Sequence, residues 1–139
     1  MKNAIAAILV SLSAISLLAS DKSVAGVYRS EVGLYVLTVT LLDNGNYLAR
    51  WDSDIGSNGT ATGSWTFQDG EVRLSPKKEE GHPMTGYLRV LFLRKFEGRQ
   101  ALLRKEDVMN DSSSLYYLYL QKKGDPVGTD NAGAARRRV

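Results

Sequence analysis

Apolar and polar residues alternate along much of the chain between residues 26 and 122. In residues 34–42 the odd positions are apolar and the even positions include two threonines: Tyr35, Leu37, Val39 and Leu41 against Thr38 and Thr40. Residues 60–67 repeat the pattern, with Ala61, Gly63, Trp65 and Phe67 on one face. A period of two predicts strands with one buried face.

Tight-turn signals separate these segments. Asn44-Gly45 and Asp69-Gly70 are dipeptides that favour two-residue hairpins, because type I′ turns need positive φ at both central positions. The pattern predicts about eight strands: residues 27–29, 34–42, 47–52, 60–67, 72–74, 86–97, 100–105 and 115–121. The strand through residue 74 is expected to end at Pro76, with a polar surface loop over residues 76–83.

Short strands joined by tight turns favour sequential antiparallel pairing. Closing such a sheet on itself removes exposed edges, which otherwise invite aggregation. We therefore expect an all-β fold, an antiparallel up-and-down barrel of about eight strands. A two-sheet β-sandwich is the alternative.

Residues 1–20 have the layout of a secretory signal peptide: Lys2, then an apolar run, then small residues before Asp21. The apolar run is shorter than the roughly 20 residues of a spanning helix. We expect an exported protein, periplasmic or secreted, with no stable membrane span after cleavage. Residues 21–123 would form the barrel domain, and residues 124–139, rich in Gly, Ala and Arg, a disordered tail.

Composition and charge indicate how the fold is held together and which partners are not expected. The chain contains no cysteine, so no disulfide can hold the fold and core burial has to suffice. The net charge is +3, with Lys and Arg interspersed among Asp and Glu. A nucleic-acid binder would gather its basic residues in one stripe or patch, so nucleic acid is not an expected partner.

Several segments resemble small exported bacterial lipocalin-like barrels, which share a Gly-x-Tyr opening, a DGxY hairpin, a GxW strand and a G-x-[VI]-x-L strand in this order. The corresponding segments here are Gly26-Val27-Tyr28, residues 43–47, Gly63-Ser64-Trp65 and residues 70–74. The N-terminal barrel of copper-resistance outer-membrane lipoproteins is similar in pattern. That family carries a Cys-containing motif and a lipidated Cys, both absent here, so copper binding and lipid attachment do not carry over.

Residues with catalytic or metal-binding potential are few. His82 is the only histidine, so a typical zinc or copper site cannot be assembled, and no Gly-x-Ser-x-Gly accompanies it. The run from Asp52 to Asn58 resembles a calcium loop but departs from the EF-hand pattern. Asp107 and Asp111 lie in loop-like sequence without glycosidase spacing. We expect no cofactor, no metal and no catalysis, with a small residual chance of a hydrolase.

Two binding functions remain. Tyr35, Trp51 and Trp65 lie on apolar strand faces and could line a cavity for a small apolar or amphipathic ligand. Residues 86–97 and 115–121 are apolar on both faces, which favours either a covered core or a surface for an envelope protein or a homodimer. The sequence thus predicts a non-catalytic ligand-binding module, with a packed protein-interaction module as the alternative.

Overall fold

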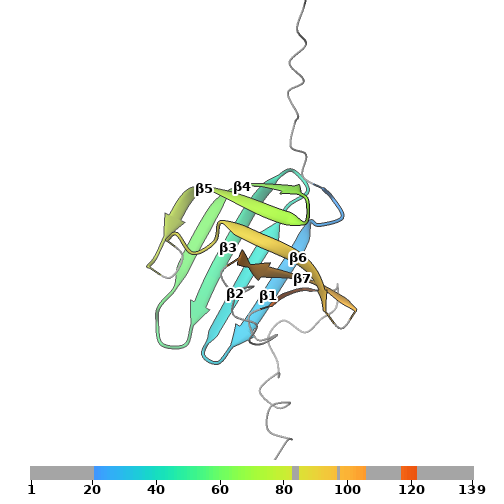
Figure 1. Cartoon of the computed structure of the whole chain (residues 1–139). Helices are drawn as coiled ribbons and strands as arrows, with labels where there is room; N and C mark the ends of the chain where they lie inside the picture. The colour runs from blue at the N-terminus through green and yellow to red at the C-terminus, as the bar shows by residue number, and fades with distance from the viewer. Residues whose placement is uncertain (1–20, 83–84, 97, 106–116, 122–139) are drawn as a thin grey trace, which may run out of the picture.

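The computed structural model describes residues 21–82, 85–96, 98–105 and 117–121, which form a closed barrel (Figure 1). Each strand pairs antiparallel with the next, and β8 returns to β1. This confirms the predicted up-and-down barrel of eight strands over the sandwich. The strands are β1 (Gly26–Val32), β2 (Tyr35–Leu41), β3 (Asn46–Ser53), β4 (Gly59–Gln68), β5 (Glu71–Glu80), β6 (Val90–Phe96), β7 (Arg99–Arg104) and β8 (Leu118–Leu120).

Inward-facing positions of every strand meet in one hydrophobic core. Along β2 the buried residues are Leu37, Val39 and Leu41, as the alternation predicts. The later strands add to the same cluster Tyr47, Ala49, Ala61, Trp65, Val72, Leu74, Leu91, Leu102 and Leu118. Burying one large apolar side chain contributes about 1.5–3 kcal/mol, so this core accounts for a fold without disulfides.

One end of the barrel, called the closed end below, is formed by the β2–β3, β4–β5 and β6–β7 turns. Val24, just before β1, is buried in the core there. The Tyr28 hydroxyl donates to the Val24 carbonyl at 2.6 Å and accepts from Gln100 Nε2 at 2.7 Å. Trp65 Nε1 donates to the Leu42 carbonyl at 2.9 Å. At this end, these bonds therefore join β1 to the preceding segment and to β7, and join β4 to the β2–β3 turn.

The predicted loop over residues 76–83 is wrong for its first half, because β5 continues through Pro76 to Glu80. Gly63 pairs with Pro76 and Thr62 with Lys78, so β5 carries one extra residue at this point. Such a β-bulge leaves a residue outside the hydrogen-bond ladder, and proline is tolerated at bulges for this reason. Pro76 therefore does not end the strand, because the bulge accommodates it.

The predicted start of the sixth strand at Gly86 is also wrong, since β6 begins at Val90. Residues 85–89 form turns and a bend, with Gly86 at φ 73°. Leu88 in this connection is nevertheless buried, and its side chain belongs to the core. The apolar residues before Val90 thus belong to a connection that packs on the core and not to the strand.

Other expectations lie outside the described residues: the signal peptide over residues 1–20, the tail over residues 124–139, and residues 115–116 of the last predicted strand. Over the ranges that the structure describes, there is no helix of sufficient length and apolarity to cross a membrane.

Candidate functional site

The end of the barrel opposite the closed end, called the loop end below, carries the β1–β2, β3–β4, β5–β6 and β7–β8 connections. Three aromatic residues meet there: Tyr35 from the start of β2, Trp51 from late β3, and Tyr87 from the β5–β6 connection. The ring centres of Tyr35 and Trp51 are 5.2 Å apart, and those of Trp51 and Tyr87 are 5.3 Å apart in an edge-to-face arrangement. These are favourable aromatic geometries. We call these three residues the aromatic cluster.

A guanidinium group borders the aromatic cluster. Arg104, the last residue of β7, places its guanidinium carbon 4.0 Å from the ring centre of Tyr87. A cation at this distance is attracted by the ring's electron-rich face. The Arg104 guanidinium therefore borders the cluster on the side of β7.

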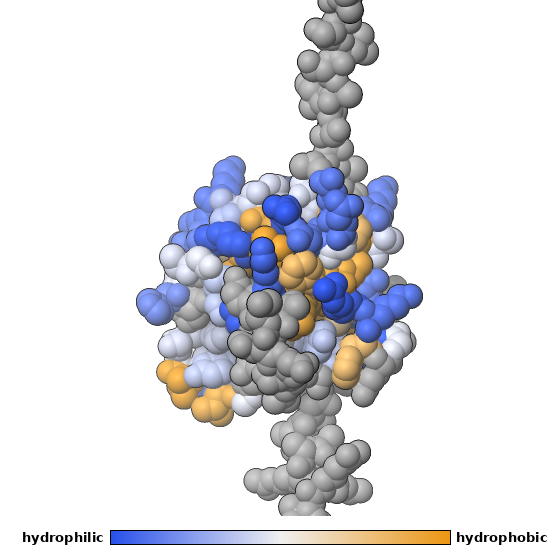
Figure 2. Space-filling model, in the orientation of Figure 1, coloured by the Kyte–Doolittle hydropathy of each residue, from blue (hydrophilic) through white to orange (hydrophobic). Residues whose placement is uncertain are grey.

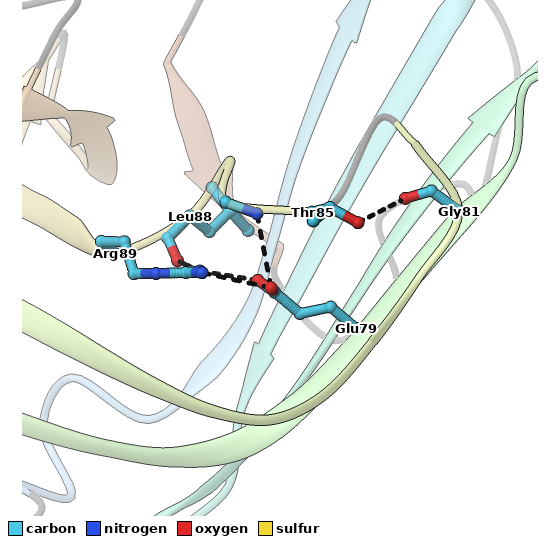
Figure 3. Close-up of polar contacts among 6 residues, drawn as sticks. Glu79, Gly81, Thr85, Leu88 and Arg89 are labelled. Carbon is cyan, nitrogen blue, oxygen red and sulfur yellow. Dashed lines mark hydrogen bonds and ion pairs between the residues drawn. The ribbon is translucent and has the colours of Figure 1, made fainter.

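An ion pair holds the β5–β6 connection that carries Tyr87 (Figure 3). The Glu79 carboxylate accepts hydrogen bonds from Arg89 Nη1 at 2.6 Å, from Arg89 Nη2 at 3.1 Å and from the Gly86 amide at 3.4 Å. Arg89 Nη1 also donates to the Leu88 carbonyl at 2.7 Å. The hydrogen bonds from Arg89 are the main cause that lowers the pKa of Glu79. Tyr87 is thus positioned by a carboxylate at the end of β5.

Two polar atoms on the inner face of β3 are buried without a hydrogen bond. They are Tyr47 Oη and Trp51 Nε1, for which the described residues supply no partner. Between them on the same face is Ala49, which pairs with Ala61, so this layer of the wall is made of small side chains. An unsatisfied buried polar group costs about 1–3 kcal/mol, and in a native protein each one calls for an explanation.

The Glu79–Arg89 ion pair also affects the pKa of Tyr47. Burial raises the pKa of its hydroxyl, and the negative charge of Glu79 raises it further, while Arg89 opposes the effect. The Tyr47 hydroxyl therefore keeps its proton at neutral pH. It remains available as a hydrogen-bond donor inside the barrel.

The structure divides the three ligand-binding residues predicted from the sequence. Tyr35 and Trp51 are in contact at the loop end. Trp65 belongs to the core, is 2% exposed, and has its Nε1 bonded to Leu42 at the closed end. Trp65 therefore fills the core, where we had expected a common cavity with Trp51.

Sequence reasoning missed most of the polar groups at this site. Glu79 was assigned to a solvated loop, and Arg89 and Arg104 were not singled out. Tyr47 and Tyr87 were noted only as strand residues. The two-residue alternation of strands could have identified Glu79. Once the bulge at Pro76 is allowed for, Glu79 pairs with the buried Ala61 of β4 and therefore lies on the same face of the sheet.

The other sequence candidates do not contribute to the aromatic cluster. His82 is exposed in the turn after β5. Asp52 accepts from Arg50 Nε at 2.9 Å, and Asn58 Oδ1 accepts from the Ser53 amide at 3.1 Å, so the β3–β4 loop uses these side chains itself. No group of three His, Cys, Asp or Glu that could hold a metal occurs in the described part of the chain. Asp107 and Asp111 lie outside it.

The two-sided apolarity of β6 and β8 has a structural explanation. Leu91 is in the core, and Leu93 packs against it. On the other face, Phe96 stacks on Tyr117 at 5.2 Å and Arg94 lies over Phe92 at 5.1 Å. In Figure 2 apolar residues gather near the middle of the face that β6 and β7 present, with hydrophilic residues around them.

This outer aromatic face, defined by Phe92, Phe96, Tyr117 and Tyr119, is half-buried. Tyr119 contacts both Phe96 and Tyr117, and the Arg99 guanidinium lies 4.9 Å from its ring centre. The aromatic rings therefore cover one another in part, and Arg94 and Arg99 lie over the rings of Phe92 and Tyr119.

A hollow of about 510 Å³ lies elsewhere, on the wall beside the closed end. It is lined by Ala25, Gly26, Val27, Thr40, Leu41, Leu42, Asp43 and Asn44. None of the aromatic-cluster residues borders it, and it contains neither of the two unpartnered polar atoms. We therefore take the loop end as the candidate site.

Comparison of the chain with protein-family models, with curated proteins and with solved structures finds no significant match. The loop end has to be interpreted from its own geometry.

Proposed function

We propose that this protein is an exported, non-catalytic binding module that takes a small amphipathic ligand at the loop end of its barrel. The observation that carries the proposal is the pair of buried, unpartnered atoms, Tyr47 Oη and Trp51 Nε1, on the inner face of β3, together with the aromatic cluster to which Trp51 belongs. A ligand with one apolar part and one polar part would pack on the rings and satisfy these atoms.

Tyr35 is the natural entry point. Trp51 Nε1 is shielded from solvent, so a ligand has to displace a covering side chain to reach it. Tyr35 contacts Trp51 and is 36% exposed, and it stands at the very start of β2. Of the three aromatic-cluster residues it is the most exposed, so it is the one that we expect a ligand to displace.

The charges at the loop end favour binding over catalysis. Glu79 and Arg89 neutralise one another in a two-pronged pair, and the pKa of Glu79 lies below its ordinary value. A general base or acid works best with a pKa near the operating pH. The Glu79–Arg89 pair is suited to holding the β5–β6 connection in place.

Native mass spectrometry of protein purified from its natural host tests this proposal. We expect an adduct of a few hundred daltons on the wild-type protein. Trp51→Ala should lose the adduct, because it removes the platform between Tyr35 and Tyr87. Tyr119→Ala, on the outer aromatic face, is the matched control and should retain it. A wild-type protein without adduct, or an adduct that survives Trp51→Ala, contradicts the proposal.

A second candidate function is protein interaction through the outer aromatic face. Its support is the packed core together with the stacked Phe96 and Tyr117 on the outside of the barrel. This function predicts a complex or homodimer in the same spectra, lost in Tyr119→Ala and kept in Trp51→Ala. The two variants thus separate the two functions.

A further inference from the structure

We infer that two neighbouring hairpin tips at the loop end dock on the surface of a lipid bilayer. The tips are the β1–β2 turn, residues 33–34, and the β3–β4 loop, residues 54–58. The inference goes beyond the proposed function, because it concerns an outer surface and is carried by other residues. It follows from where the most exposed apolar side chains lie, from the open space beside them, and from the charge of the tips.

The two most exposed large apolar side chains of the described residues lie on these tips. Leu34 is 53% exposed and Ile55 is 64% exposed. The Asp54 amide donates to the Leu34 carbonyl at 3.2 Å, which holds the two tips side by side. In Figure 2 apolar residues stand at the lower left edge of the molecule, where Figure 1 places the β1–β2 and β3–β4 connections. Apolar side chains that gather on a surface indicate an interaction site, whereas isolated ones are ordinary.

Both tips are narrow turns with open space beside them. Gly33 and Gly56 adopt left-handed conformations, with φ 61° and 86°, and a Cβ added at either position would meet no atom within 4 Å. Leu34 directly follows the first glycine, and Ile55 directly precedes the second. The apolar side chains are therefore carried by turns that the rest of the barrel does not crowd.

A bilayer fits such a surface better than a protein partner does. A stable protein interface buries about 800 Å² on each partner and needs a complementary shape, whereas two narrow turns offer few apolar side chains. The boundary between lipid headgroups and acyl chains accepts apolar side chains without a matching surface. Tyr35, directly after Leu34, is a residue type that favours this boundary, because its ring is apolar and its hydroxyl is polar. Docking would also bring Tyr35, the expected entry point for the ligand, next to lipid.

The charge of the tips indicates which lipids they accept. Asp54 is the one charged residue on the two tips. The carboxylates on the adjoining strand ends are paired, Glu31 with Arg29 at 2.7 Å and Asp52 with Arg50 at 2.9 Å. Because the tips supply no cation that would attract anionic headgroups, we expect them to dock on neutral, zwitterionic lipid.

Flotation with phosphatidylcholine vesicles of the protein purified from its natural host tests the inference. Leu34→Thr/Ile55→Thr should lower the partition coefficient about tenfold or more, since burying the exposed part of one large aliphatic side chain is worth about a factor of ten. Val27→Thr/Leu48→Thr is the matched control. These two residues are 39% and 45% exposed on the barrel wall, where both pair with Thr40, and their replacement should leave binding unchanged.

Brominated phosphatidylcholine reports the orientation of the bound protein, because it quenches only a tryptophan that lies near the acyl chains. Trp51 contacts Tyr35 at the loop end, whereas Trp65 donates to Leu42 at the closed end. Trp65→Phe, which keeps Trp51, should therefore be quenched. Trp51→Phe, which keeps Trp65, should not be quenched.

Four results would overturn the inference. Unchanged binding in the tip variant, or quenching of Trp65 in place of Trp51, means that another face meets the lipid. Binding that requires phosphatidylglycerol means that basic residues, such as those at 136–138, make the contact. Absence of vesicle binding excludes a bilayer and leaves a protein partner for the tips. The adduct on the wild-type protein is measured separately, so the proposed function stands or fails independently of these results.

Discussion

Gly63 in β4 lies against Pro76 in β5, with no room for a side chain between the two strands. A Cβ at Gly63 would stand 2.9 Å from Pro76 Cα and would collide with the Ser75 carbonyl oxygen. The neighbouring atoms are backbone, so they cannot give way as the end of a flexible side chain can. This contact fixes the position of the bulge in β5.

Gly63→Ala should therefore be strongly destabilising. Overpacking of a tight contact typically costs about 1–3 kcal/mol, and a backbone neighbour favours the upper part of that range. Chemical denaturation followed by tryptophan fluorescence measures the change. Ser64→Ala, the exposed next residue, is the control and should be nearly neutral. Equal stability of the two variants would show that the bulge relaxes freely.

The two tryptophans should respond in opposite ways to replacement by phenylalanine. Trp65→Phe removes a made hydrogen bond to Leu42 in the core and should destabilise by about 1–2 kcal/mol. Trp51→Phe removes a donor that has no partner and should leave unfolding free energy unchanged or slightly raised, while it weakens ligand binding. Denaturation of both variants without ligand provides the measurement. A large loss in Trp51→Phe would mean that its indole is already satisfied.

Stability at acid pH should depend on Glu79. Because Arg89 holds the folded-state pKa of Glu79 below its ordinary value of 4.5, the pair contributes its full stabilisation above pH 4.5. The contribution falls as the pH drops from there through the folded-state pKa, where the carboxylate takes up a proton.

Glu79→Gln should lower stability at pH 7 by about 1 kcal/mol, typical of a well-formed surface pair. It should also flatten the acid branch of the stability curve below pH 4.5. Thermal unfolding between pH 3 and pH 7 gives both readings. Asp54→Asn, in the exposed β3–β4 loop, controls for the loss of one carboxylate. An acid branch that is as steep in Glu79→Gln as in wild type would contradict this assignment.

The closed end should depend on one hydroxyl. Tyr28→Phe removes both the bond to the Val24 carbonyl and the bond from Gln100, and it should cost about 1–3 kcal/mol because the carbonyl of the buried Val24 loses this donor. Hydrogen exchange at the Val24 amide, which donates to Asp21 at 2.9 Å, should accelerate. Tyr117→Phe on the outer face is the control. Unchanged exchange at Val24 would show that core packing alone holds this segment.

The fold was predictable because every second residue of a half-buried strand is apolar, and this alternation is visible in the sequence. Leu37, Val39 and Leu41 were placed in the core from their spacing, and the structure confirms them. Two strand boundaries were wrong because each was predicted from a single residue. Pro76 predicts a strand end, but a bulge can hold a proline; Gly86 predicts a strand start, but its segment is a turn that leads to the buried Leu88.

The candidate site was predictable only in part. Tyr35 and Trp51 were found because large aromatics on an apolar face stand out. Trp65 shares that property, and nothing in its spacing says that it faces the closed end. Glu79 and Arg89 meet across ten positions of sequence, and their contact follows from the path of the β5–β6 connection, which no residue pattern encodes.

The seam between β1 and β8 determines when the barrel can finish folding. Over the described residues it pairs Tyr28 with Leu120 and Arg29 with Tyr119, joining the two most distant strands of the sequence. Contacts of large sequence separation form late, because the loop between them must first close. A chain that emerges N-terminus first therefore carries one unpaired edge of β1 until β8 has followed. During that interval β1 can recruit a foreign strand, so misassembly should be greatest while the chain is incomplete.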